Sequence, residues 1–396
     1  MSHLIPKYLS EAMEQKLFEI ENAIRINIPK YDRVGVLDGK SGIALFYYWL
    51  YRYTNKDEYI DICIDIVYEE VEKIGKSRMD TYFFNGLAGI VWLVEYLINK
   101  NVFEKSDSIL NSTRHILLSN ADTALHHNNY ELMSGAIGYM MPFIQSKDEK
   151  ELGHFVNKLF EKAESNNKTL KWKSIDFNDN SEMYCFGLAH GMSGIVRVTS
   201  KLINQELIDN KYIKNLEEVS NFYSDTIEKQ FSKNSLLPNW IKSKTIDNEI
   251  GRLAWCHGDL GAGIGFLNSG LDTGSEQLLN MGNKLLSKTA RRKDLKLENI
   301  IDTCLCHGTA GFSHIYYKAY CRTQIESYLE TSLYWFDKTL KMAKHNNTYA
   351  GYLFHVGEQG WTKSINILNG IAGTGLTILS MLHSENIDWD ECLLLN

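Results

Sequence analysis

Two kinds of apolar segment alternate along the chain. In one kind, apolar residues recur every three or four positions, as at Met13, Leu17 and Ile20 and again between 213 and 227. Residues at this spacing share one face of an α-helix and leave the other face polar. We therefore predict amphipathic helices in these segments, with their apolar faces against the core.

The other kind of segment begins with a Gly-x-x-Gly motif that occurs seven times. The residue before the first glycine is Asp38, Asn85, Ser134 or Asn369 in four copies, and these residue types are preferred at a helix N-cap. Each glycine pair is therefore predicted to open a helix, and in these four copies the residue before the pair is predicted to cap it. The first glycines of the seven copies are Gly39, Gly86, Gly135, Gly191, Gly258, Gly308 and Gly370.

The repeat predicts the fold class. Glycines three apart lie on one helix face and allow another backbone to approach closely. Two helices per repeat, seven times over, predict an all-α fold, an (α/α)7 toroid with glycine-led inner helices and amphipathic outer ones. An open solenoid with polar caps is the alternative. Because seven copies nearly fill the 396 residues, we favour the closed ring, as a single domain over residues 1–396.

Two intervals between copies are longer than the rest. One contains Asn234 to Trp240 and the other contains Gly351, Gly357 and Gly360, so both are expected to hold irregular or short extended insertions. If the helices form a ring, these insertions border the end where the inner helices start. We expect them to contact substrate there.

A histidine pair stands outside the repeats. Residues 125–129 read Leu-His-His-Asn-Asn, which is typical of a polar loop. We expect His126 and His127 to be solvated in that loop.

Composition and charge narrow the function classes. With 44% apolar and 23% charged residues the chain is typical of a globular protein, and its net charge of −7 argues against nucleic acid. No apolar run is long enough to span a bilayer, and Glu11 and Glu14 stand where a signal peptide is apolar. We expect a cytoplasmic protein. Its seven cysteines, an odd number scattered along the chain, favour reduced thiols and metal ligands over disulfides.

Candidate metal chemistry lies directly before two of the glycine pairs, at Cys256-His257 and Cys306-His307. Thiolate and neutral imidazole are favoured ligands of zinc, and the positive end of a helix N-terminus promotes the thiolate. Equivalent positions of a ring of helices fall at one end, so we predict one zinc ion held by Cys256, Cys306 and His307. Such a site keeps a fourth position open for water or substrate, as catalytic zinc sites do. Two alternatives remain: His257 would complete a closed structural site, and Cys304 could bind in place of Cys306.

Acid–base chemistry is predicted at His190, which stands before the fourth glycine pair among small and apolar neighbours. A neutral imidazole that titrates near physiological pH suits proton transfer. Glu131, by itself, is read as a solvated carboxylate. Arg252 either supplies a charge near the site or is a surface arginine. Trp255 either forms a wall of the site or is an indole of the core.

Four segments resemble motifs of one known family. Residues 187–191, 252–258, 306–308 and 368–373 are similar to the motifs of the lanthipeptide cyclases, the LanC and LanC-like proteins. The order and spacing of the motifs agree over nearly the whole chain, so the combined pattern is specific.

The resemblance implies an (α/α)7 barrel with one zinc ion. It implies that Cys256, Cys306 and His307 hold the ion, that a water occupies the open position, that His190 is the acid–base residue and that Arg252 lines the site.

Two positions depart from the family pattern. Glu131 stands where relatives carry aspartate, and His257 stands where tyrosine is frequent. The longer acidic side chain puts the role of Glu131 in doubt. A histidine at 257 puts in doubt either the aromatic packing at this position or the number of protein ligands of the zinc ion. His257 and Trp255 are also candidate substrate-binding residues.

The activity implied by the resemblance is closure of thioether rings in a peptide. A zinc-bound cysteine thiolate would add to a dehydroalanine or dehydrobutyrine of the same peptide, and His190 would protonate the resulting enolate. Glu131 would orient a group or assist a proton transfer in this reaction. The product is lanthionine or methyllanthionine. The expected partners are a dehydrated precursor peptide, a LanB-like dehydratase and an exporter, in an assembly that would hold the protein at the membrane.

Three other functions compete with this hypothesis. A zinc-dependent protein prenyltransferase also activates thiols, but its Asp, Cys and His ligand set has no counterpart in this sequence. A LanC-like protein that binds glutathione or peptide around a structural zinc would use His257 as a fourth ligand. A toroid glycosidase would need paired carboxylates and no zinc, and the Cys-His pairs argue against it.

Overall fold

The computed structural model describes residues 5–76, 78–166, 168–176, 179–229, 234–242, 250–385 and 387–396. These residues form two compact units. Unit 1 comprises Met1–Leu97 and Leu295–Cys392, and unit 2 comprises Ile98–Asp294 and Leu393–Asn396. The single domain over residues 1–396 stays a prediction.

All seven Gly-x-x-Gly motifs open a helix, as predicted. Almost every residue of these helices up to the last turn is buried, so they form the core of their unit. The glycine-led helices are α2 (Lys40–Thr54), α4 (Leu87–Asn99), α6 (Ala136–Ser146), α8 (Met192–Asn204), α10 (Gly258–Thr273), α12 (Thr309–Thr323) and α14 (Ile371–Leu382).

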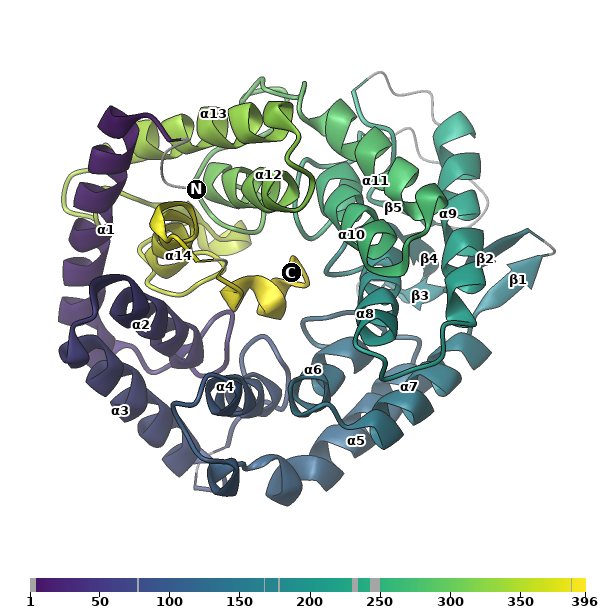
Figure 1. Cartoon of the computed structure of the whole chain (residues 1–396), viewed down its shortest axis with the longest axis horizontal. Helices are drawn as coiled ribbons and strands as arrows, with labels where there is room; N and C mark the ends of the chain where they lie inside the picture. The colour runs from purple at the N-terminus through teal and green to yellow at the C-terminus, as the bar shows by residue number, and fades with distance from the viewer. Residues whose placement is uncertain are drawn as a thin grey trace. The chain divides into compact units, whose positions relative to one another are not determined.

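An amphipathic helix precedes or follows each of them. In the first, the predicted stripe of Met13, Leu17, Ile20 and Ile24 is fully buried. Figure 1 shows the resulting hairpins, for example α2 beside α3 and α12 beside α13 in unit 1, and α10 beside α11 in unit 2. The amphipathic helices are α1 (Lys7–Asn27), α3 (Asp57–Lys73), α5 (Leu110–His126), α7 (Glu149–Glu161), α9 (Tyr212–Lys229), α11 (Glu276–Thr289) and α13 (Glu326–Met342).

The predicted side-chain caps are wrong. Asp38, Ser134 and Asn369 stand one residue outside their helices, whose N-cap is the glycine, with no side-chain cap bond. Asn85 does not cap α4 either, because its side-chain oxygen is buried without a hydrogen bond. The preceding loop instead provides an acceptor for the first turn of the helix: the first helical N–H donates to the backbone carbonyl seven residues earlier. This bond is made by Lys40, Leu87, Ala136, Thr309 and Ile371.

The second glycine of six motifs explains why the loop before the helix can fold back onto it: the six are Gly42, Gly89, Gly194, Gly261, Gly311 and Gly373. A Cβ atom on Gly261 would lie 1.9 Å from the carbonyl oxygen of Trp255, and one on Gly311 would lie 2.0 Å from that of Leu305. A backbone does approach these glycines closely, but the closest atoms belong to the loop before the same helix and not to the neighbouring backbone that the sequence predicts. In these six motifs the loop packs against the first turn of its own helix, which restricts the positions of the side chains that the loop carries.

Short strands occupy the two longer intervals, as predicted, whereas the four described strands between α7 and α8 were not predicted. The strand β5 (Trp240–Lys242) pairs with β4 (Glu182–Cys185), which also pairs with β3 (Ser174–Ile175), and Trp240 lies opposite Cys185. This pairing brings the insertion after α9 to the loop that precedes α8. The other strands form two antiparallel hairpins, β1 (Glu164–Asn166) with β2 (Thr169–Lys171) and β6 (Phe354–His355) with β7 (Trp361–Thr362).

Four short 3-10 helices complete the described elements. They are η2 (Ile28–Lys30), η3 (Lys105–Asp107), η4 (Gly357–Gln359) and η5 (Trp389–Leu393). None of the described helices combines the length and the apolar composition that crossing a membrane requires.

Candidate metal centre and acid–base pair

His190 and Glu131 form a hydrogen-bonded pair at the starts of α8 and α6. Nδ1 of His190 lies 2.8 Å from Oε2 of Glu131. The same carboxylate accepts the N–H of Met133 at 3.0 Å, the hydroxyl of Ser134 at 2.7 Å and the backbone N–H of Ser134. Glu131 is therefore held in one orientation by its own loop, and it is not the solvated carboxylate that the sequence suggests.

Each member of the His190–Glu131 pair stabilises the charged form of the other. Burial raises the pKa of the Glu131 carboxyl, but the hydrogen bonds from His190 and Ser134 outweigh burial and hold that pKa below its usual value. Burial lowers the pKa of His190, but the bond to Glu131 and its charge, with a smaller effect from Cys256, raise that pKa above its usual value. Because Nδ1 faces the carboxylate, Nε2 is the nitrogen left to exchange a proton with a substrate.

The loop of His190 is joined to the loop of Cys256. The backbone N–H of His190 donates to the carbonyl of Cys256 at 3.5 Å. A Cβ atom on Gly187 would lie only 2.0 Å from that same carbonyl oxygen, so a glycine is needed where the two loops meet. The metal-binding atoms of His190, Cys256 and His257 all lie within 4.8 Å of one another.

His257 lies between aromatic neighbours. Its ring stacks on that of His190 with 4.8 Å between centroids, and the ring of Trp240 packs edge-on against it at 5.6 Å. Burial, followed by the charges of His190 and Arg252, lowers the pKa of His257 to about 3, which keeps the imidazole neutral. Its Nδ1 is buried and finds no hydrogen-bond partner among the described residues. A neutral nitrogen of this kind can bind a metal or accept a hydrogen bond from a substrate.

A second ligand group lies in unit 1, on the loop before α12. The metal-binding atoms of Asp302, Cys304 and His307 lie within 4.8 Å of one another. Asp302 accepts the N–H of Cys304 at 3.0 Å and that of His355 at 2.9 Å. The sulfur of Cys304 accepts the N–H of His307 at 3.3 Å. Asp302 and Cys304 therefore hold the loop that carries Cys306 and His307.

Trp255 and Arg252, the other predicted site residues, both lie on the loop that leads to Cys256. Trp255 is a buried indole that donates to the carbonyl of Leu393 at 2.9 Å. Arg252 is half-buried, and its backbone N–H donates to the side chain of Asn239 at 2.8 Å. Cys256 belongs to unit 2 whereas Cys306 and His307 belong to unit 1, so the convergence of these three on one ion stays a prediction.

Sequence reasoning missed Asp302 and Trp240 as members of these groups. Trp240 had a partial signal, because it ends the insertion that was expected to contact substrate. Asp302 had none, since its partners are backbone N–H groups, one of them 53 residues away.

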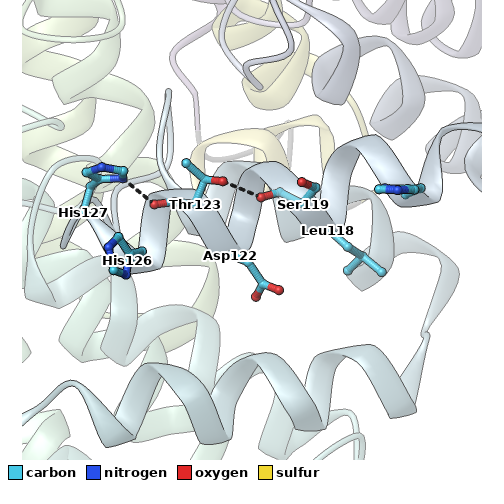
Figure 2. A pocket seen from close by; sticks show the side chains of 7 residues that line it. Leu118, Ser119, Asp122, Thr123, His126 and His127 are labelled. Carbon is cyan, nitrogen blue, oxygen red and sulfur yellow. Dashed lines mark hydrogen bonds between the residues drawn. The ribbon is translucent and has the colours of Figure 1, made fainter.

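The histidines near 126 do not lie in a loop. The helix α5 continues to His126, and His127 is its C-cap, with Nδ1 2.8 Å from the carbonyl oxygen of Thr123. Both are exposed, as expected, and they border a surface pocket of about 680 Å3 along α5 (Figure 2). Asp122, the one acidic side chain among the described residues that line it, pairs with Lys158 at 2.7 Å. Among the described residues, no group of three metal ligands occurs at this pocket.

Comparison with known proteins identifies similar chains. A family model described as "Lanthionine synthetase C-like protein" matches residues 32–394. The nisin biosynthesis protein NisC of Lactococcus lactis subsp. lactis is 23% identical over 426 residues, which cover 98% of this chain and 96% of that protein. The solved structure of a nisin cyclase matches with a TM-score of 0.72 at 18% identity, covering 98% of both chains. This likeness confirms the predicted fold class, an all-α fold of the α/α-toroid type.

Proposed function

This chain belongs to the lanthionine synthetase C-like family, and we propose that it is a zinc-dependent lanthipeptide cyclase. It would add a cysteine thiol to a dehydroalanine or dehydrobutyrine of the same peptide, in a Michael-type addition that closes a lanthionine or methyllanthionine ring. The likeness to the nisin proteins over nearly the whole chain supports the reaction class. The hydrogen-bonded His190–Glu131 pair beside Cys256 is the observation that carries the proposal.

We propose that one zinc ion is held by Cys256, Cys306 and His307. Two thiols and one imidazole fit the donor set of an open zinc site with one position left for substrate. When bound, the ion would lower the pKa of the substrate thiol, so that the nucleophilic thiolate forms at neutral pH. Asp302 and Cys304 would orient the loop of two of the ligands, a supporting role that metal sites commonly need.

His190 would act as the acid that completes the addition. Attack of a thiolate on the β-carbon leaves negative charge on the enolate, and the α-carbon must gain a proton. His190 would donate the proton from Nε2, while Glu131 holds Nδ1–H and stabilises the imidazolium form. The raised pKa of His190 supports this role, because it keeps the ring protonated closer to neutral pH.

Other residues of the site would bind the peptide. The ring of His257, between His190 and Trp240, would form an apolar wall for the dehydrated residue. Arg252 would supply a positive charge near the developing enolate, which agrees with its effect on the pKa of His257. Trp255 is buried and would not contact the peptide; it would act through its position next to Cys256. A fixed positive charge favours an addition that generates an anion, and a wall that excludes water would strengthen that attraction.

The partners follow from the proposed reaction. A cyclase of this kind needs a peptide in which serine or threonine has already been dehydrated, so a LanB-like dehydratase would act before it. A cytoplasmic location, and peripheral attachment to the membrane through an exporter, are further parts of the proposal.

A second candidate function is supported by one observation. His257 belongs to the same ligand group as Cys256, and among the described residues its buried Nδ1 has no hydrogen-bond partner. With His257 as a fourth ligand the site would be closed and structural, and the protein would bind glutathione or a peptide without closing rings.

Incubation of the purified protein with a dehydrated, cysteine-containing peptide tests the proposal. We expect free thiols to disappear at constant peptide mass, as detected by alkylation and mass spectrometry, and we expect a chelator to stop their loss. A zinc-loaded protein that binds the peptide and leaves every thiol free to alkylate would support the second candidate instead.

A further inference from the structure

The last four residues of the chain, Leu393–Asn396, are held inside unit 2, and we call them the tail. Leu393, Leu394 and Leu395 are each at most 2% exposed. Three buried side chains donate hydrogen bonds to tail carbonyls: Trp255 to Leu393 at 2.9 Å, Asn268 to Leu395 at 2.9 Å, and Arg197 to Asn396.

The backbone of the tail is held in an unfavourable conformation by these contacts. Leu394 has a φ of +59°, in the left-handed region that side chains other than glycine rarely adopt. Such a conformation persists only where its surroundings fix it. The tail is therefore a fixed part of unit 2 and presents its carbonyls to defined partners.

One of these partners is adjacent to a proposed zinc ligand. Trp255 precedes Cys256, and its fully buried indole has Leu393 as the acceptor of its N–H. The carbonyl of Trp255 lies against Gly261 in the first turn of α10, and the carbonyl of Cys256 accepts the N–H of His190. A displacement of the indole would therefore be passed on to Cys256 and to the loop of His190.

We propose that the tail is a positioning element of the active site. By accepting the indole N–H it fixes Trp255, and through Trp255 it fixes the sulfur of Cys256 in the geometry that zinc requires. A buried donor without its acceptor is costly, so loss of the tail contact would make the Trp255 loop rearrange. Groups that orient a metal ligand commonly affect metal affinity about 10- to 100-fold. This inference rests on the proposed function, in which Cys256 binds zinc.

A pair of tryptophan variants separates positioning from general stability. Trp255→Phe removes the N–H and retains most of the aromatic packing. Trp172→Phe is the matched control: its indole is also fully buried in unit 2, and it donates to a backbone carbonyl, that of Leu159, at 2.8 Å. Zinc affinity is measured by competition with a chromophoric chelator, and ligand geometry by the thiolate-to-metal absorption bands of the cobalt(II)-substituted protein.

We expect Trp255→Phe to lose at least about tenfold in zinc affinity and to shift the cobalt–thiolate bands, while Trp172→Phe changes neither. Asn268→Ala, which releases the tail at Leu395 and leaves Trp255 unchanged, should alter affinity and spectrum in the same direction. This second variant keeps the test decisive if Trp255→Phe does not fold.

If Trp255→Phe and Asn268→Ala have the same zinc affinity and the same cobalt spectrum as Trp172→Phe, the inference is overturned and the proposed function stays intact. A wild-type protein that binds no zinc would overturn both the inference and the proposed function. The zinc affinity of the wild-type protein therefore distinguishes failure of the inference from failure of the proposed function.

Discussion

Gly187→Ala tests the contact between the two loops of the site. An added Cβ would lie 2.0 Å from the carbonyl oxygen of Cys256 and 2.5 Å from the Cα of His257, both of which are backbone atoms. An ordinary contact begins near 3.4 Å, so the loops must separate by about 1.4 Å. The hydrogen bond from His190 to Cys256 is already 3.5 Å long and would be lost.

The magnitude follows from these two effects. Overpacking costs roughly 1–3 kcal/mol and a lost hydrogen bond about 0.5–1.5 kcal/mol, so we expect Gly187→Ala to lower the free energy of unfolding by about 1.5–4.5 kcal/mol. A displacement of about 1 Å at a reacting group can slow catalysis by about 100-fold, so ring closure should slow by a similar factor.

The control is the same substitution at a site with space. Gly153 lies within α7, and an added Cβ there meets no atom within 4 Å. Alanine is the better helix former, so Gly153→Ala should stabilise the protein by about 0.5–1 kcal/mol. Urea unfolding and single-turnover cyclisation measure both variants. If Gly187→Ala unfolds at the same urea concentration as Gly153→Ala and closes rings at the wild-type rate, the two loops do not meet as described.

Three further predictions concern other parts of the chain. Glu131→Gln removes the charge that raises the pKa of His190, so cyclisation should slow by about 10²–10⁴-fold with zinc content unchanged; a wild-type rate would exclude the pair from proton transfer. Burial raises the pKa of Glu70 to about 8, against 4.5 in the unfolded chain. The folded state therefore keeps a proton that the unfolded state loses, and stability present below about pH 4.5 is lost as the pH rises towards 8, by at most about 1.4 kcal/mol per pH unit. Glu70→Gln should flatten this dependence and raise stability at pH 8 in thermal unfolding, whereas an unchanged pH profile would contradict it. Trp240→Ala exposes the ring of His257, so the KM for peptide should rise more than kcat falls; unchanged values of both would remove Trp240 from the substrate site.

Much of the fold follows from the sequence because one local motif repeats. The first glycine of each pair marks the start of a helix, and in six of the pairs the second admits the carbonyl of the loop before it, as at Gly261 and Gly311. The cap prediction failed because these loops supply backbone hydrogen bonds to the first turn. A preference for side-chain caps at Asp38 or Ser134 cannot reveal a bond between two backbone groups seven residues apart.

The sequence indicates which residue types form the candidate site, but it does not indicate which of these residues contact one another. His190 and Glu131 are recognisable as chemical groups, yet their hydrogen bond joins two loops 59 residues apart and depends on the folded repeat. The same holds for Asp302, whose carboxylate binds backbone N–H groups that have no sequence signature. The link from the tail to Trp255 spans 138 residues, and nothing in the pattern of either segment indicates it.

X-ray absorption at the zinc edge tests the central claim most directly, because it counts the sulfur atoms bound to the ion. For the zinc-loaded wild-type protein we predict two sulfur ligands at about 2.3 Å with lighter nitrogen or oxygen ligands at about 2.0–2.1 Å. In Cys256→Ala the sulfur count should fall to one. Two sulfur ligands that persist in Cys256→Ala, or a wild-type spectrum without sulfur, would contradict a zinc site that Cys256 shares with Cys306 and His307.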